Sequence, residues 1–186
     1  MGAPLFSVRP VRLVASERLP FAPPSPGPIL LGHDMTFDID RTAPATGRAE
    51  IVIAAPVHAV WTKYTDLADW PDWNSGVEWI GANIPLDPGA RFEWRAGGLT
   101  IRSCLQAVEP ERVIGWTGET LFISARHVTR FADLGAGTRV LTEESFRGAY
   151  ARLMPGHAAR QIEAALLQGL RHLKDACEGR RRKRAA

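Results

Sequence analysis

Cysteine is scarce in this sequence. Its 186 residues include only Cys104 and Cys177, which lie far apart and belong to no CxxC pair. Structural zinc sites and disulfide frameworks need cysteines at short or recurring spacings. We therefore expect neither kind of site, and two free thiols fit the reducing environment of the cytoplasm.

Long apolar runs and cofactor-binding motifs are also missing. No apolar stretch approaches the roughly 18 residues of a membrane span, and the N-terminal segment carries arginines and prolines where a secretory signal has an apolar core. The chain has no Gly-x-Gly-x-x-Gly motif, phosphate-binding loop or Gly-x-Ser-x-Gly elbow, and its His, Asp and Glu residues show no metal-ligand spacing. We expect a cytoplasmic protein with no membrane span, no metal and no cofactor.

Positive charge is concentrated at the C-terminus. The net charge is +3, to which residues 1–34 contribute +1 and residues 171–186 contribute +5, so that residues 35–170 carry −3. The central part is therefore mildly acidic, and its charge predicts no specific nucleic-acid binding. The basic tail 180–186 is either a solvated end, which we favour, or the contact point of a protein-interaction module.

Proline is dense in the first 34 residues, which hold seven of the chain's 14 prolines. Proline at this density removes backbone donors and disfavours both helices and strands. We predict a disordered extension over residues 1–34, one domain over residues 35–179 and a disordered basic tail over residues 180–186. Because Met35 begins the first patterned segment, an over-extended start site is one explanation for the extension.

The patterned part begins with a strand and a helix. Residues 49–54 (AEIVIA) form a β-branched run typical of a strand. Pro56 suits a first helical turn, and apolar residues then recur at the spacing of an amphipathic helix: Val57, Val60, Trp61 and Tyr64. This stripe assigns Trp61 to the core.

Tryptophan gathers in the next segment, Leu67–Gly81 (LADWPDWNSGVEWIG), which holds three of the chain's six tryptophans. A short second helix is expected here, but Pro71 pushes Trp70 away from the α conformation and must interrupt or restart it. The segment is either a tryptophan-rich part of the core or the lip of a pocket for a flat, apolar molecule.

The middle of the chain predicts antiparallel strands joined by tight turns. Gly97-Gly98 lies between alternating runs, a pattern typical of a two-residue hairpin. Counting back from it gives these cross-strand pairs: Trp94–Ile101 and Phe92–Ser103 on a buried face, and Glu93–Arg102 on the opposite face. A turn at Pro110-Glu111 then places Trp116 beside Leu105 on the buried face, unless a bulge near Ala107 reverses the assignment.

A second hairpin turns at Gly135-Ala136. With Leu134 opposite Gly137, the register gives three further pairs: Phe131–Val140, Thr129–Thr142 and His127–Glu144. The first pair is apolar, so the same parity sends His127 and Glu144 inward together, and a slip of one residue would reverse this result. The residues of opposite parity are expected to be outward charges: Arg126, Glu143 and Arg147.

The last predicted element is a helix over residues 155–178. Its apolar stripe consists of Ile162, Leu166, Leu170, Leu173 and Cys177, and Gly179 is placed to end it. About 24 helical residues span roughly 36 Å, enough to cross a sheet.

This order of elements resembles the START-like (SRPBCC) superfamily, and within it the polyketide cyclase/dehydrase group of bacterial proteins. The likeness extends over nearly all of residues 35–179 and is carried by FDIDRTAP, IAAPVHAVWTKYTDLADWPDWNSGV, FEWRAGGLTIRS and GTRVLTEESFRG. It implies an α+β helix-grip fold, in which a curved antiparallel sheet wraps around the long helix and leaves a cavity for hydrophobic ligands such as lipids, sterols or polyketides. The same resemblance places Trp70 and Trp73 near the cavity mouth, although packing in the core is the alternative for both.

The candidate ligand-binding residues combine these inward positions with the segment at the mouth. They are Trp70, Trp73, Phe92, Trp94, Ile101, Ser103, Trp116, Thr129 and Thr142. Aromatic rings supply apolar contact at low entropic cost, and hydroxyl groups can donate hydrogen bonds, although backbone-bonded hydroxyls are more common.

His127 and Glu144 are the candidate catalytic pair. An aromatase acting on a poly-ketone needs an acid/base group and a hydrogen-bond donor in an apolar cavity, and a carboxylate can orient an imidazole and raise its basicity. A buried His–Glu contact that only steadies two strands is the interpretation that we favour. His58, His157 and His172 are assigned no chemistry.

Three functions therefore remain open. Binding, with transport as an extension, of a small hydrophobic ligand is favoured, because it requires only the cavity. A polyketide cyclase/dehydratase using His127 and Glu144 is the alternative, and an interaction module acting through residues 180–186 is the third.

Overall fold

The computed structural model of the protein describes residues 37–81 and 84–179. The predictions of a disordered extension over residues 1–34 and of a disordered basic tail over residues 180–186 lie outside the described residues.

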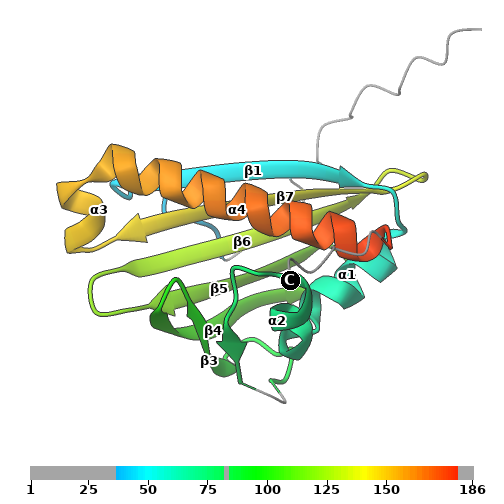
Figure 1. Ribbon diagram of the computed structural model, residues 1–186, viewed down its shortest axis with the longest axis horizontal. Helices are drawn as coiled ribbons and strands as arrows, with labels where there is room; N and C mark the ends of the chain where they lie inside the picture. Colours follow the sequence, from blue (N-terminus) through cyan, green and yellow to red (C-terminus); the bar gives the residue numbers. More distant parts are fainter. Residues whose placement is uncertain (1–36, 82–83, 180–186) are drawn as a thin grey trace, which may run out of the picture. The chain divides into compact units, whose positions relative to one another are not determined.

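A curved antiparallel sheet forms the body of the described part (Figure 1). Its seven strands follow the order β1-β7-β6-β5-β4-β3-β2. The strands are β1 (Ala45–Ile53), β2 (Trp79–Ile80), β3 (Arg91–Ala96), β4 (Leu99–Glu109), β5 (Val113–Glu119), β6 (Ser124–Asp133) and β7 (Thr138–Arg147). Neighbours in sequence are therefore neighbours in space, except that β1 pairs with the last strand, β7.

Helices pack against one face of this sheet. They are α1 (Val57–Thr65), the 3-10 helix η1 (Leu67–Asp69), α2 (Trp70–Trp73), α3 (Ala149–Leu153) and α4 (Pro155–Cys177). The long helix α4 lies mainly along β1 and also contacts β7, α1, α2 and α3. Its predicted apolar stripe is buried from Ile162 to Leu173, and the helix-grip architecture predicted from the sequence is confirmed.

Gly47 permits the closest approach of α4 to the sheet. A Cβ atom at this position of β1 would lie 2.5 Å from Cγ2 of Ile162 and 3.0 Å from the backbone nitrogen of Glu163. Ile162 is itself almost fully buried. Any side chain at position 47 would therefore force the helix away from β1.

The β3–β4 and β6–β7 hairpins have the predicted registers. Each residue pair expected from the Gly97-Gly98 turn is present, and Nε of Arg102 lies 3.1 Å from Oε1 of Glu93 on the outer face. Gly97 and Gly98 have φ values of 56° and 75°, which favour glycine. In the second hairpin Leu134 donates to the carbonyl of Gly137, and His127 pairs with Glu144.

The β4–β5 pairing agrees with its prediction for a reason that the sequence analysis did not anticipate. The turn has one more residue than expected, because Glu109 pairs with Val113. A bulge between Leu105 and Ala107 takes up the extra residue and restores the Leu105–Trp116 pair. The bulge thus preserves the inward direction of Trp116, because the longer turn had shifted the register by one residue.

The prediction that Pro71 keeps Trp70 out of the α conformation was wrong. Trp70 has φ −54° and ψ −44°, begins α2 directly after η1, and is followed by Pro71 in the first turn. Proline is tolerated there because the first turn of a helix has no intrahelical acceptor for its N–H groups. The indole N–H of Trp70 also donates to the carbonyl of Tyr64 at 2.7 Å, which holds the restarted helix against α1.

The outer face of the sheet carries a second, smaller core. Phe37 and Ile39 pack on Val113 and Val128, and a Cβ atom at Gly115 would lie 2.7 Å from the Phe37 ring. The segment before β1 therefore covers the outer face of β5 and β6.

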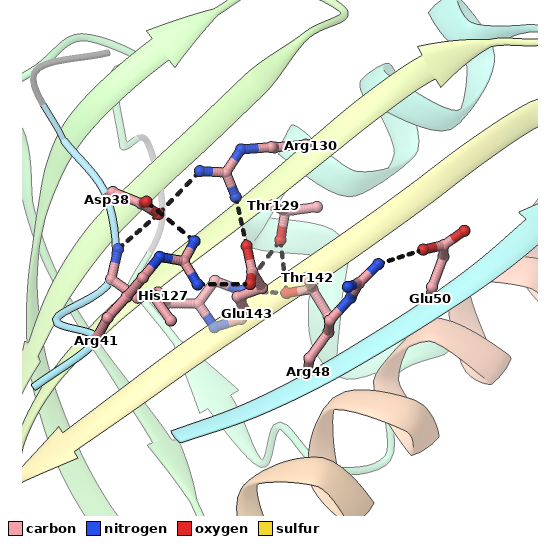
Figure 2. A network of polar contacts seen from close by, with 10 residues as sticks. Asp38, Arg41, Arg48, Glu50, His127, Thr129, Arg130, Thr142 and Glu143 are labelled. Atoms are coloured by element: carbon pink, nitrogen blue, oxygen red, sulfur yellow. Dashed lines mark hydrogen bonds and ion pairs between the residues drawn. The ribbon is translucent and has the colours of Figure 1, made fainter. Parts of the chain in front are cut away.

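Ion pairs reinforce this cover (Figure 2). Arg130 bridges Oδ1 of Asp38 at 2.9 Å and Oε2 of Glu143 at 2.8 Å, and Arg41 also contacts Glu143. Burial opposes ionisation of Asp38, but hydrogen bonds from Arg130 and from the backbone N–H of Ile39, together with the charges of Arg130 and Arg41, outweigh it and lower the pKa of this carboxyl. Glu143 faces outward as predicted but is buried beneath this segment.

We predict that Gly47→Ala lowers the free energy of unfolding by about 1–3 kcal/mol, because the added methyl group overpacks the contact with α4. Urea unfolding of the full chain measures the change. The matched variant Gly47→Ala/Ile162→Ala should lose less stability than the sum of the two single variants, since truncating Ile162 makes room for the methyl group. Additive losses would contradict the close contact.

Candidate functional site

A cavity of about 190 Å³ lies between α4 and the inner face of the sheet. Helix α4 lines it from Ala165 to Leu170, and the segment Trp70–Val77 lines the adjacent side. Gly76, Ala165 and Gln168 are exposed, so the mouth opens between α4 and the segment that follows α2. A wider depression, of about 640 Å³ around Arg147, Gly148 and Arg152, lies on the surface and contains none of the predicted site residues.

Five aromatic side chains line the cavity: Tyr64, Trp70, Trp73, Trp94 and Trp116. Their rings contact one another, with centroids 5.7 Å apart for Trp70 and Trp116, 5.9 Å for Trp70 and Trp94, and 6.4 Å for Trp70 and Trp73. Trp70 is therefore the centre of the aromatic cluster. These packed rings fix the shape of the wall before any ligand enters.

Hydroxyl groups surround one nitrogen of His127 (Figure 2). Nε2 of His127 lies 3.0 Å from the hydroxyl of Thr142, 3.1 Å from that of Thr129 and 3.3 Å from that of Tyr64. The hydroxyls also bond to one another, at 2.8 Å between Tyr64 and Thr129 and 2.9 Å between Thr129 and Thr142. This cluster satisfies its own polar groups inside the core, as buried polar groups require.

The other side of the imidazole faces Glu144. Nδ1 of His127 lies 3.6 Å from Oε1 of Glu144, which is close enough for electrostatic attraction but too long for a hydrogen bond. The imidazole also stacks on Trp116, with centroids 4.1 Å apart and planes at 13°. His127 therefore has a fixed orientation between an aromatic ring, a hydroxyl cluster and a carboxylate.

Tyr64 belongs to this site although the sequence analysis treated it only as part of a helix stripe. Burial raises the pKa of its phenol well above the ordinary value of 10.0, against the hydrogen bond from Thr129 that lowers it. Tyr64 is therefore a neutral hydroxyl that can donate or accept. One sequence signal could have identified this role, namely a tyrosine in an otherwise apolar helix stripe. A buried phenol needs a hydrogen-bond partner, so such a tyrosine indicates a polar neighbour in the core.

The structure brings most of the predicted site residues together. Those lining the cavity are Trp70, Trp73, Trp94, Trp116, His127, Thr142 and Glu144. Thr129 lies directly behind the wall, fully buried, and contributes through the hydroxyl cluster.

Phe92, Ile101 and Ser103 do not line the cavity. Ser103 accepts a hydrogen bond from the indole of Trp94 at 3.0 Å, and Phe92 packs on Trp116 with centroids 6.5 Å apart. These two residues support the wall from behind. Ile101 is half-buried opposite Trp94 in the β3–β4 pair.

Asn74 and His172 form a polar contact at the mouth that the sequence analysis missed. Asn74 lines the cavity, and its Oδ1 lies 3.3 Å from Nδ1 of the buried His172. No local pattern could have paired them, because they are 98 positions apart and meet only through the packing of α4.

No group of three or more His, Cys, Asp or Glu in residues 37–81 and 84–179 lies close enough to hold a metal ion. None of the helices in the same part is long and apolar enough to cross a membrane.

We predict that Tyr64 makes the protein less stable above pH 10. The unfolded chain loses its phenolic proton near pH 10, whereas the folded chain keeps it, so the free energy of unfolding falls as the pH rises, by about 1.4 kcal/mol in total between pH 9 and pH 11. Tyr64→Phe should remove this part of the slope, and Thr129→Val, which keeps the phenol, should retain it. Equal slopes for wild type and Tyr64→Phe in urea titrations from pH 9 to 11 would refute the assignment.

Comparison with solved structures places this fold among known proteins. A hypothetical protein, jhp0584, from Helicobacter pylori is 16% identical over 73% of this chain and 89% of its own, with a TM-score of 0.66. TTHA0849 from Thermus thermophilus is 20% identical over 72% of this chain and 97% of its own (TM-score 0.61). The di-domain ARO/CYC StfQ from the steffimycin biosynthetic pathway is 15% identical over 73% of this chain and 51% of its own (TM-score 0.61). At these identities the likeness shows the fold alone.

Sequence comparison identifies the family. A comparison with curated proteins gave no match. Residues 44–178, which include every strand and helix described above, match one family model. This match shows that the chain belongs to the family described as polyketide cyclase / dehydrase and lipid transport.

Proposed function

We propose that this protein binds a small, largely apolar molecule in the cavity beneath α4. The observation that carries the proposal is the composition of the wall: five aromatic rings enclose the space, and the polar groups are confined to a few positions. Pockets of this kind gain affinity from apolar burial and orient the ligand with a small number of polar contacts. The family, whose description includes lipid transport, supports ligand binding in general.

The volume of the cavity limits the size of the ligand. At about 190 Å³, the space is somewhat larger than the roughly 150 Å³ that accommodates benzene in a cavity engineered into another protein. A single ring with short substituents therefore fits the cavity as it stands. A complete lipid or a long polyketide chain would require α4 to move away from the aromatic wall.

Gly169 offers a direct test, because it lies in the cavity wall on α4. A Cβ atom there would have only Asn74 nearby, at 3.8 Å, so a larger side chain has open space to enter. Gly156, near the start of the same helix, lies outside the cavity and serves as the matched position.

We predict that Gly169→Met weakens ligand binding at least tenfold and that Gly156→Met leaves it unchanged, because only the first side chain occupies the cavity. Native mass spectrometry of the full-length protein after incubation with lipid and polyketide extracts measures the bound species. Wild type should retain a mass of roughly 100–200 Da. Equal binding by both variants would place the ligand elsewhere, and urea unfolding checks that both variants fold.

A second candidate function, a cyclase or dehydratase, rests on the position of His127 and Glu144 in the cavity wall. Removal of a proton next to a ketone needs a base, and the enolate that forms needs a hydrogen-bond donor. The carboxylate or imidazole could act as the base, and Tyr64 could donate through its neutral hydroxyl.

If the protein is an enzyme, His127→Ala and Glu144→Gln should each lower kcat/KM for a short linear poly-ketone by about 10²–10⁴. Thr129→Val tests the hydroxyl cluster alone and should have a smaller effect, since Thr129 lies behind the wall. Chromatographic analysis of cyclised products measures turnover. Unchanged turnover in the first two variants would exclude this candidate and leave the binding proposal intact.

A further inference from the structure

Exposed apolar side chains gather at one end of the sheet, outside the cavity. Among the large apolar residues of the described part, the three most exposed are Leu121 at 86%, Leu153 at 81% and Phe122 at 62%. Met154, next to Leu153 in the chain, is 51% exposed. Single exposed apolar residues are ordinary on a protein surface, whereas several on adjoining segments mark a site of contact.

Two turns bring these four side chains to the same end of the molecule. Leu121 and Phe122 lie in the connection between β5 and β6, and Leu153 and Met154 lie where α3 meets α4. Figure 1 shows the β5–β6 connection and α3 at the same end of the sheet. A Cβ atom at Gly148, directly before α3, would lie 2.2 Å from the carbonyl oxygen of Phe122. The β5–β6 connection therefore packs against the start of α3.

The charge of this end is opposite to that of the domain. Residues 145–162, which contain α3 and the first two turns of α4, include three arginines and neither Asp nor Glu, whereas residues 35–170 as a whole carry −3. Arg147 is paired with Asp40. Arg152 and Arg160 are exposed and have no ion pair within the described part of the chain. Two uncompensated positive charges therefore remain at this end.

The basic and apolar groups share one part of the surface. Arg152 and Leu153 both line the depression of about 640 Å³ beside Gly148. Arg160 reaches back over the first turn of α4, because a Cβ atom at Gly156 would lie 3.7 Å from its guanidinium. An exposed guanidinium thus lies beside an exposed apolar side chain next to the α3–α4 junction.

We propose that this end of the protein docks on the surface of an anionic lipid bilayer. The docking surface consists of Leu121, Phe122, Arg152, Leu153, Met154 and Arg160. The apolar side chains would enter the boundary between headgroups and acyl chains, and the guanidinium groups would contact the anionic headgroups.

Charge favours a bilayer over a second copy of the chain as the occupant. A symmetric dimer through this surface would bring the same two arginines, Arg152 and Arg160, close to their counterparts, where like charges repel. An anionic bilayer attracts both. The docking surface shares no residue with the cavity wall, so the inference does not depend on the proposed ligand-binding function.

Flotation of the full-length protein with vesicles tests the docking surface. Wild type should bind vesicles of equimolar phosphatidylcholine and phosphatidylserine, and bind vesicles of phosphatidylcholine alone more weakly. Leu121→Ser/Leu153→Ser should weaken the partition to the mixed vesicles at least tenfold, because two apolar side chains no longer enter the bilayer.

The matched control is Val52→Ser/Leu134→Ser. It also removes two exposed apolar side chains, but these lie at the opposite end of the sheet, at the end of β1 and in the β6–β7 turn. This variant should partition like wild type. All variants keep residues 180–186, so any contribution of the basic tail is the same in each.

A third variant, Arg152→Gln/Arg160→Gln, tests the contribution of charge. It should lower the partition to the mixed vesicles at least fivefold and leave that to phosphatidylcholine alone unchanged, because only the first surface is anionic. An equal partition of this variant and wild type to the mixed vesicles would contradict the role of the arginines and with it the choice of an anionic bilayer.

Three other results would overturn the proposal. Wild type that fails to bind the mixed vesicles has no such surface, and equal binding by wild type and Leu121→Ser/Leu153→Ser would assign the contact to another part of the chain. A wild-type dimer in light scattering without vesicles, converted to a monomer by the same two substitutions, would identify a second copy as the occupant. Urea unfolding midpoints within the range of wild type exclude loss of fold as the cause of any difference.

Discussion

The contact between α4 and β1 at Gly47 determines where this fold has room for a ligand. Because a glycine faces Ile162, the helix settles closely on the first strand. Its main contacts are with β1, and it also contacts β7, so the helix covers one side of the sheet. The space above the remaining strands is filled instead by side chains from α2, β3 and β5, most of them tryptophans, and what they leave unfilled is the cavity.

The polar cluster around His127 depends on the register in which β6 pairs with β7. Thr129, Thr142 and His127 point to one face because β6 and β7 pair without a bulge. A slip of one residue would move all three to the outer face and would turn Arg130 and Glu143, which are paired there beneath the segment before β1, toward the apolar inner face, which is far more costly. The ion pairs on the outer face therefore stabilise the register that holds the inner hydroxyls together, and Figure 2 shows the two sets on neighbouring positions of the same strands.

The sequence predicted the elements whose geometry is local. Two glycine-containing turns, Gly97-Gly98 and Gly135-Ala136, indicated the hairpins. Counting back from them gave the cross-strand partners of His127 and Trp94, because the side-chain period of a strand is constant. The same counting could not reveal the extra turn residue near Pro110 or the bulge that compensates for it. The extra turn residue and the bulge shift the register in opposite directions and cancel. The predicted pairing of Trp116 with Leu105 therefore agrees with the structure, although neither deviation was predicted.

Features that depend on packing between distant segments were not accessible in this way. Trp70 is helical before Pro71, and its indole donates to the carbonyl of Tyr64, a contact between two helices that no local pattern could predict. Glu143 was expected to be an outward charge and is outward, but the segment before β1 buries it. The predicted site residues included four of the five rings in the cavity wall but not that of Tyr64, and the small volume of the cavity follows from how the rings pack.

The arrangement around His127 indicates which atoms can face a ligand. Nε2 carries either one proton or one lone pair, and three hydroxyls already lie within 3.3 Å of it. A ligand that used this nitrogen would have to displace part of a buried and mutually satisfied network. Nδ1 and the carboxylate of Glu144 have no such competition, since their separation of 3.6 Å leaves both with hydrogen-bonding capacity. Recognition, and any proton transfer that accompanies it, should therefore take place on the Glu144 side of the imidazole, while Tyr64 and the two threonines hold Nε2 in place.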